Sequence, residues 1–308
     1  EHVVYDSISE SKSLDAFEIL YGKRALPTYD FSKSDMIVSF DADFLVDWQG
    51  GGFSKGYSKS RVPKNGKMSK HYQFEANMSL TGANADVRIP LKPSIQKLAL
   101  LKIYEYISGE NVNVELEDEL DAKIKKLASD LKKSSGKGVF ITGISDVNAQ
   151  LIALKINHLI NSKVININKL SLIRNGNDTK VDKVVTDVIN KSVDGLIMCG
   201  VNPSYSLPNS NVFNEALKSL ELSVSFSMNN TETAMLSKWV AATPHYLESW
   251  GDLEIKSGNY SLIQPTIKPL FDTKQFQDVL LNWIDSNDSY YDYLKLYWNN
   301  RILKGLSW

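Results

Sequence analysis

Polar side chains that could contact a ligand follow two apolar, strand-like runs of the sequence. Asp41 and Asp43 come directly after the first run, and Asn202 and Pro203 come directly after the second. In open α/β sheets, ligands bind in the crevice beside the carboxyl ends of the strands. These four residues are therefore candidates for lining a dinucleotide crevice, and capping of the two loops is the alternative interpretation.

Two further places could bind the polar parts of a nucleotide. Glu75 ends an alternating run that contains Tyr72 and Phe74, so its carboxylate could accept hydrogen bonds from a ribose; solvent exposure or a structural ion pair is the alternative. Thr231 and Glu232 open a predicted helix. Free N–H groups there could bind a phosphate, or Thr231 could simply cap the helix.

The other reactive side chains do not assemble into a catalytic set, and no catalytic residue is predicted. His71 and Glu75 are four residues apart, but their alternating context favours a strand and no third ligand is nearby, so no metal site is predicted. Cys199 lies in an apolar strand and is interpreted as a small buried residue. The Gly- and Lys-rich segment 49–68 matches neither a P-loop nor the dinucleotide glycine pattern, which favours a flexible basic loop.

Composition excludes several classes of protein. The 308 residues include 35 Lys and Arg against 36 Asp and Glu, so the net charge of −1 offers no excess positive charge for nucleic acid. No apolar run approaches the roughly 20 residues of a membrane-spanning helix. The single cysteine cannot supply the thiolates of an iron–sulfur cluster. We therefore expect no nucleic-acid partner and no direct insertion into a membrane.

Alternating helix and strand patterns must position the candidate residues. Short apolar runs alternate with segments of helical spacing, which is typical of parallel sheets with helical crossovers. Residues 35–43 and 194–202 share an order of acid, apolar strand and polar loop, which indicates two units of common plan. The sequence thus predicts an α/β protein of two Rossmann-like αβα units with mainly parallel sheets.

The expected domain boundary lies near residue 112. Gly109 and the acidic run 115–121 separate two periodic segments there. We therefore expect a first Rossmann-like unit at residues 1–112, a second at 113–285 and a helical tail at 286–308.

An ordered series of motifs resembles the molybdopterin oxidoreductase superfamily. In that family one strand ends in Gly-x-Asn-Pro, and a later strand leads into a Thr-Glu-Thr-Ala helix; the matching residues are Gly200–Pro203 and Thr231–Ala234. Three further segments are similar to the large molybdopterin-oxidoreductase-like, iron–sulfur subunit of bacterial alternative complex III. They are His71–Glu75, Leu80–Asp86 and His245–Asp252.

Departures from the family pattern affect the residues that would hold the cofactor. Cofactor-bearing relatives have Asp-Pro-Arg at the end of the second strand, where this chain has Glu75-Ala76-Asn77, and an acid where this chain has Ser227. A carboxylate binds two ribose hydroxyls and an arginine binds a phosphate more strongly than Ser227 and Asn77 can. The resemblance therefore implies a vestigial crevice and no cofactor in this chain.

The resemblance also implies a function and a location. The chain is expected to be part of a subunit of a quinol-oxidising respiratory electron-transfer complex, acting mainly as a cofactor-free scaffold with no complete active site. The expected partners are other domains of the same parent chain and other subunits of the membrane complex, at the periplasmic face of the inner membrane. The alternative is part of a genuine molybdenum enzyme that binds a bis-molybdopterin guanine dinucleotide cofactor.

Overall fold

The computed structural model describes residues 1–308, which fold as two compact units. The N-terminal unit comprises residues 10–175, and the C-terminal unit comprises residues 1–9 together with residues 176–308. Each unit contains a parallel sheet with helices packed against it. The prediction of an α/β protein with Rossmann-like units is therefore confirmed.

Four parallel strands form the central sheet of the N-terminal unit, in the order β4-β3-β2-β5. They are β2 (Met36–Phe40), β3 (Lys70–Glu75), β4 (Val87–Pro90) and β5 (Gly138–Thr142). Every residue of β2 and β5 is buried, as expected for continuous apolar strands covered on both faces. The carboxyl ends of all four strands lie at one edge of the sheet, where Asp41 and Glu75 are found.

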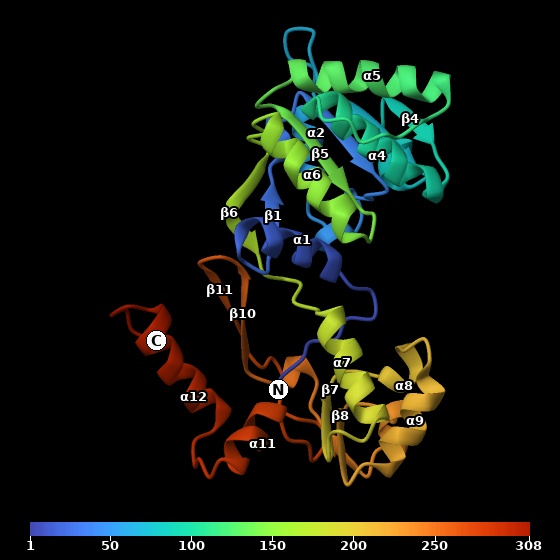
Figure 1. Ribbon diagram of the computed structural model, residues 1–308. Helices are drawn as coiled ribbons and strands as arrows, with labels where there is room; N and C mark the ends of the chain where they lie inside the picture. Colours follow the sequence, from blue (N-terminus) through green and yellow to red (C-terminus); the bar gives the residue numbers. More distant parts are fainter. The chain divides into compact units, whose positions relative to one another are not determined.

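Helices and loops of the N-terminal unit enclose two apolar cores, one on each face of this sheet. The three long helices pack around Phe40, Phe74 and Phe140, and Figure 1 shows them together. On the other face, Ile37 and Val139 pack under a short helix and two 3-10 turns. The helices are α2 (Ser54–Ser60), α3 (Leu80–Ala83), α4 (Pro93–Ser108), α5 (Asp118–Lys133) and α6 (Val147–Leu159); the turns are Phe31–Lys33 and Trp48–Gly50.

The N-terminal unit also contains a separate strand pair. Helix α1 (Ser11–Tyr21) leads into β1 (Leu26–Tyr29), which pairs antiparallel with β6 (Ile165–Ser171). Phe17 of α1 packs with Leu154 of α6, so this pair is attached to the same unit as the main sheet.

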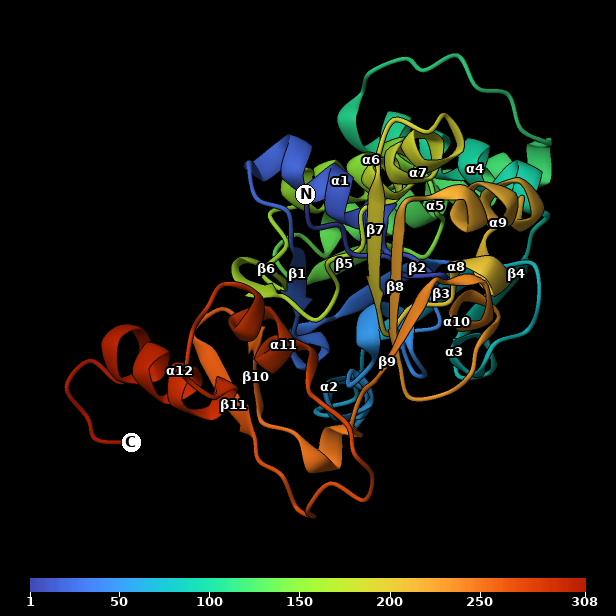
Figure 2. The same ribbon diagram turned by 90° about the horizontal axis from the view of Figure 1, so that it is seen from below.

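The C-terminal unit has a three-stranded parallel sheet in the order β7-β8-β9. Figure 2 shows the strands side by side. Met198 packs with Phe213 and Leu217 of a covering helix, which forms the apolar core of this unit. The elements are α7 (Asp178–Ile189), β7 (Gly195–Cys199), α8 (Pro203–Ser206), α9 (Ser210–Ser219), β8 (Leu222–Ser227), α10 (Glu232–Leu236) and β9 (Trp239–Ala242).

A hairpin and two helices complete the C-terminal unit. Strands β10 (Gly251–Lys256) and β11 (Asn259–Ile263) pair antiparallel. After the short turn Tyr246–Glu248 and this hairpin, the chain forms α11 (Phe276–Trp283), α12 (Tyr290–Tyr297) and a π-type turn, Trp298–Ile302. The predicted tail 286–308 thus contains one helix and this turn.

The boundary between the units differs from the predicted one. Residues 113–175 were expected in the second unit, but they belong to the N-terminal unit because β5 pairs with the whole length of β2. Gly109 ends α4 in the left-handed conformation, with φ 83°, and α5 then packs back against α4. The glycine and the acidic run therefore mark a connection between two helices rather than a domain boundary.

No helix of the chain is both long enough and apolar enough to cross a bilayer.

Candidate functional site

The two parallel sheets end in the same backbone turn. After β2, Asp41 adopts a left-handed conformation (φ 53°) and its N–H donates to the carbonyl of Phe74 at 2.8 Å. After β7, Gly200 adopts the same conformation (φ 64°) and its N–H donates to the carbonyl of Phe226 at 3.0 Å. Each turn carries the chain across the end of the neighbouring strand, so the repeat inferred from the sequence is present as matched geometry.

The polar residue that follows each turn binds the first turn of a short helix. In the N-terminal unit, Asp43 Oδ1 accepts from the backbone N–H of Thr81 at 3.0 Å and from its hydroxyl at 2.5 Å. In the C-terminal unit, Asn202 Oδ1 accepts from the corresponding groups of Thr233 at 3.1 and 2.8 Å. The threonine hydroxyls also accept from Leu45 N–H and Ser204 N–H, both at 3.0 Å. Asp43 and Asn202 therefore hold each strand-end loop to its helix.

Valine substitutions at the two threonines should destabilise the units unequally. Each substitution leaves a backbone N–H without its partner, Leu45 in one unit and Ser204 in the other. Thr81→Val also removes a hydrogen bond to a carboxylate, whereas Thr233→Val removes one to a neutral amide. We expect a loss of about 2–3 kcal/mol for Thr81→Val and about 1–2 kcal/mol for Thr233→Val, by the usual magnitudes for charged and neutral hydrogen bonds. Urea unfolding, monitored by hydrogen exchange of backbone amides in β3 and in β8, measures the free energy of unfolding of each unit separately. Equal losses would show that the charge of Asp43 contributes nothing.

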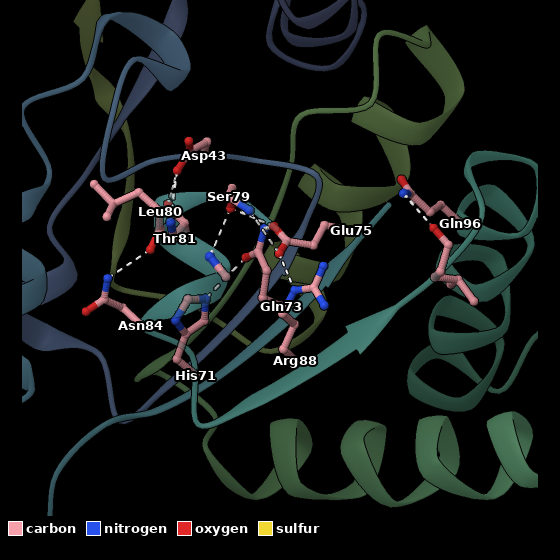
Figure 3. A network of polar contacts seen from close by, with 12 residues as sticks. Asp43, His71, Gln73, Glu75, Ser79, Leu80, Thr81, Asn84, Arg88 and Gln96 are labelled. Atoms are coloured by element: carbon pink, nitrogen blue, oxygen red, sulfur yellow. Dashed lines mark hydrogen bonds and ion pairs between the residues drawn. The ribbon is translucent and has the colours of Figure 1, made fainter. Parts of the chain in front are cut away.

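Glu75 is the centre of a buried polar network at the carboxyl end of β3, shown in Figure 3. Its Oε1 accepts from Arg88 Nε at 2.6 Å and from Ser79 N–H at 3.2 Å. Its Oε2 accepts from the Ser79 hydroxyl at 2.6 Å and from Gln73 Nε2 at 3.3 Å. The side chain is 2% exposed. All four lone-pair directions of this carboxylate are therefore used inside the protein, which leaves none for a ribose.

The network continues along one face of β3. Gln73 Oε1 lies 3.3 Å from His71 Nε2, and His71 Nδ1 lies 3.1 Å from the hydroxyl of Tyr57. Burial lowers the pKa of His71 to about 4, so the ring is neutral at neutral pH. Burial alone would raise the pKa of Glu75, but the hydrogen bonds from Ser79 and Arg88 outweigh it and the net pKa is lowered. A neutral histidine and an ionised glutamate thus lie on the same strand face.

Asp41 lies beside this network but outside it. The residue is exposed, and partial burial together with the charge of Glu75 raises the pKa of its carboxyl. Asp41 is thus the predicted strand-end acid of this unit that remains open to solvent.

Gly82 makes room for Glu75 in the N-terminal unit. A Cβ added to Gly82 would overlap the carboxylate of Glu75, although this glycine is in a helical conformation. At the matched position of the other unit, Ala234 follows Thr233 and the strand ends in Ser227. Glu75, which is large, occurs with Gly82, and Ser227, which is small, occurs with Ala234. The residue at the strand end and the residue after the threonine are therefore sterically coupled.

Gly82→Ala should destabilise the N-terminal unit by about 1–3 kcal/mol, the usual cost of overpacking, although Gly→Ala in a helix ordinarily stabilises. The double variant Gly82→Ala, Glu75→Ser should lose about 1 kcal/mol less stability, or better, than the sum of the losses of the two single variants. Gly56→Ala is the matched control, because its added Cβ would lie at an ordinary 3.4 Å from Phe31 N. Strict additivity in a double-mutant cycle of urea unfolding would contradict the coupling.

The strand end of the C-terminal unit is uncharged where the N-terminal one holds Glu75. The Ser227 hydroxyl donates to the carbonyl of Asn229 at 2.7 Å. Thr231 caps α10 by accepting from Ala234 N–H at 3.2 Å, and Glu232 accepts from Asn202 Nδ2 at 2.7 Å. Thr231 and Glu232 were the candidates for contacting a phosphate. In the structure Thr231 caps α10, and Glu232 binds Asn202 in the loop after β7.

A cavity of about 520 Å³ opens at this strand end, and we refer to it as the C-terminal cavity. Its walls include the carboxyl ends of β7 and β8, the segment after β9 and the first residues of α11. Among its lining residues are five aromatic ones: Phe226, Tyr246, Trp250, Phe276 and Tyr290. Of the predicted site residues, Asn202 and Thr231 line it. Pro203 is buried as the first residue of α8, a position that proline favours.

In the N-terminal unit a cavity of about 790 Å³ lies at the opposite end of the sheet. It is lined by Asp35, Lys70 and Lys137, which stand at the amino ends of β2, β3 and β5. Ligands of open α/β sheets bind at the carboxyl ends, so this cavity does not replace the crevice that Glu75 fills.

The residues of the two strand ends do not fit a pterin guanine dinucleotide. Its pyrophosphate carries negative charge, which cationic side chains bind most strongly. The C-terminal cavity is lined by no Lys or Arg, and its one charged residue is Asp252. In the N-terminal unit the carboxylate of Glu75 is already fully hydrogen-bonded. No chemical step can therefore be derived through this cofactor.

Two features of the site differ from the sequence-based interpretation or were missed by it. Cys199 was interpreted as buried, but it is exposed at the end of β7 and lines the C-terminal cavity. Cys199 is exposed because helices cover only one face of β7, and its side chain lies on the other face. Gln73 and Arg88 were not singled out, although the alternation of His71, Gln73 and Glu75 on one strand face was a signal for a buried polar row. No group of three or more His, Cys, Asp or Glu side chains is placed to hold a metal ion.

Comparison with known proteins identifies the fold. No protein-family profile matches the chain, and no curated protein matches its sequence. The structure is similar to acetylene hydratase from Pelobacter acetylenicus, with a TM-score of 0.75 and 12% identity over 97% of this chain and 54% of that chain. It is also similar to the formyltransferase/hydrolase complex (FhcABCD) from Methylorubrum extorquens, with a TM-score of 0.53 and 12% identity over 84% of this chain and 78% of that chain.

The chain spans about half the length of the acetylene hydratase chain that it matches. At this level of identity the likeness shows the fold alone. The fold is α/β and is similar to that of acetylene hydratase.

Proposed function

We propose that the chain is a scaffold module of a molybdopterin-oxidoreductase-like subunit and holds no pterin cofactor itself. The observation that carries this proposal is the full internal hydrogen bonding of Glu75 by Arg88, Ser79 and Gln73. This hydrogen-bonded network lies at the carboxyl end of β3, and ligands of open α/β sheets bind at such strand ends, so the network supports the proposal. The structural likeness to acetylene hydratase, a molybdenum/tungsten enzyme, supports the part of the proposal that derives this fold from molybdopterin enzymes.

The wider setting of the proposal is a quinol-oxidising respiratory complex at the periplasmic face of a membrane. The sequence motifs that resemble the large subunit of alternative complex III support this setting. Several large apolar side chains at the end of α11 and on α12 are exposed, and we propose that partners within such an assembly cover them. They include Trp283, Ile284, Tyr293 and Leu296, which are 46–73% exposed.

Cofactor analysis of the purified chain tests the proposal. The chain is expressed in a host that makes molybdopterin guanine dinucleotide, and the pterin released by acid and the bound molybdenum and tungsten are quantified. We expect neither above the level of an unrelated protein purified in parallel, because the C-terminal cavity has no Lys or Arg and the carboxylate of Glu75 is fully hydrogen-bonded within the protein. One or two pterins per chain would instead identify part of a genuine molybdenum enzyme.

A further inference from the structure

We propose that the C-terminal cavity binds an uncharged, planar aromatic molecule, a ligand class that differs from a phosphate-bearing dinucleotide. The inference goes beyond the scaffold role, which concerns only the absence of a pterin cofactor. It begins from the difference between the matched strand ends. Glu75 fills the N-terminal one, whereas Ser227 leaves a cavity of about 520 Å³, which is within the usual range for small-molecule sites.

The walls of the cavity suit a flat aromatic ring. Phe226 and Phe276 pack edge to face with their ring centroids 4.7 Å apart, and both line the cavity together with Trp250. Phe226 is 2% exposed and supports the wall from behind. The partly exposed rings of Trp250, Phe276 and Tyr290 present surface to the cavity. Aromatic rings offer faces and edges on which another ring can stack or pack. The cavity therefore offers more to an aromatic ligand than to a flexible polar one.

Polar groups in the cavity can orient such a ligand without carrying charge. Asn229, Gln277 and Tyr290 line the cavity, and their side-chain amides and hydroxyl make no hydrogen bond within the protein. Each amide has donors and an acceptor, and the hydroxyl adds one of each. A heteroaromatic ring with carbonyl and N–H groups would satisfy them.

The charge around the cavity disfavours phosphates. Asp252 is its one charged lining residue, and its Oδ2 accepts from the indole N–H of Trp298 at 2.9 Å. An adjoining cavity that shares Trp250 and Tyr290 carries one lysine, Lys274, against three acids, Glu248, Asp278 and Asp288. A phosphate here would lose its hydration without gaining a cation. An uncharged ligand does not meet this penalty.

Matched pairs of ligands that differ by one phosphate test the proposal. Riboflavin and FMN, adenosine and AMP, and guanosine and GMP are titrated into the full chain, with binding followed by saturation-transfer NMR. We expect at least one uncharged member to bind, and its phosphorylated partner to bind at least tenfold more weakly. Binding by none of the three uncharged molecules would overturn the proposal, as would equal or tighter binding of the phosphorylated partners.

Three variants test the location of the site and the origin of its charge preference. Ser227→Phe places a ring in the cavity and should weaken the uncharged ligand at least tenfold, whereas Ser192→Phe, at an exposed position outside the cavity, should change nothing. Asp252→Asn keeps an acceptor for Trp298 but removes the negative charge. It should therefore reduce severalfold the difference in affinity between each uncharged ligand and its phosphorylated partner. Unchanged discrimination would show that Asp252 does not set ligand charge, and the electrostatic part of the proposal would fail.

The single cysteine provides a readout that needs no substitution. Cys199 lines the cavity, so its alkylation by N-ethylmaleimide should slow severalfold when the uncharged ligand is bound. An unchanged rate at saturating ligand would place the ligand elsewhere and contradict the proposal. The outcome is distinct from the cofactor analysis, because a chain without pterin can bind or fail to bind these molecules.

Discussion

Arg88→Ala should be among the most destabilising single substitutions in the N-terminal unit, with an expected loss of roughly 3–5 kcal/mol in the free energy of unfolding. The Glu75 side chain is 2% exposed and forms its ion pair with Arg88 at 2.6 Å. Removing the guanidinium leaves a buried carboxylate with only neutral donors, which costs more than the pair itself contributes. Urea unfolding, followed by hydrogen exchange of β3, measures the change.

Lys97→Ala is the matched control for this prediction. Lys97 pairs with Asp146 at 2.8 Å, but the lysine side chain is 52% exposed, so its removal should cost only about 0–1 kcal/mol. The pKa of Glu75 is lowered in the folded protein, so the stability that depends on its charge is present above the ordinary pKa of 4.5 and is lost as the pH falls. The effect of Arg88→Ala should therefore shrink in acid. An effect equal to that of Lys97→Ala would contradict the buried network.

Acidification should destabilise the N-terminal unit through His71 as well. Its pKa falls from 6.5 in the unfolded chain to about 4 in the folded protein, chiefly because of burial. Between these values the unfolded chain binds a proton that the folded protein does not, so stability falls as the pH falls from about 6.5 to about 4. The loss from this one residue should approach about 3 kcal/mol, at about 1.4 kcal/mol per pH unit.

His71→Gln isolates this contribution, since glutamine has no charge to titrate and retains hydrogen-bonding groups. Free energies of unfolding measured across the acidic range should fall less steeply for the variant than for the unchanged chain. Arg61 lowers the pKa of His71, while Asp86 and Glu75 raise it, but burial is the larger cause. His158→Gln, at an exposed helical position, is the control. Parallel curves for His71→Gln and the unchanged chain would show that His71 is not a buried neutral group.

The elements that the sequence predicted well are those whose pattern is local. The apolar run Met36–Phe40 and the run Gly195–Cys199 are strands, and both end in the polar loops that the sequence placed there. The Thr231 cap and the α/β class follow from the same short-range signals. The matched contacts of Asp43 and Asn202 show that the internal repeat was readable because each loop must satisfy the same backbone groups.

The features that the sequence could not predict depend on contacts between distant residues. Whether β5 joins the first sheet or starts a second one is decided by its pairing with β2, about a hundred residues earlier. The bonding of Glu75 depends on Arg88 from the next strand and on the space left by Gly82. Exposure of Cys199 depends on how few elements cover one face of β7. None of these is encoded in a local pattern.

The central claim concerns the two strand ends. The N-terminal one is filled by the Glu75 network and the C-terminal one lacks cationic side chains, so more has changed than the two residues Asn77 and Ser227. Calorimetric titration of the chain with GDP, which carries the guanosine and pyrophosphate parts of a pterin guanine dinucleotide, tests it directly when repeated on the double variant Asn77→Arg, Ser227→Asp. Two regained charge-assisted contacts supply only about 3–6 kcal/mol, whereas micromolar affinity requires about 8 kcal/mol. We predict no submicromolar binding for either protein. Submicromolar binding by the double variant would show that the crevice is intact and lacked only an arginine at position 77 and an aspartate at position 227, which would contradict the account.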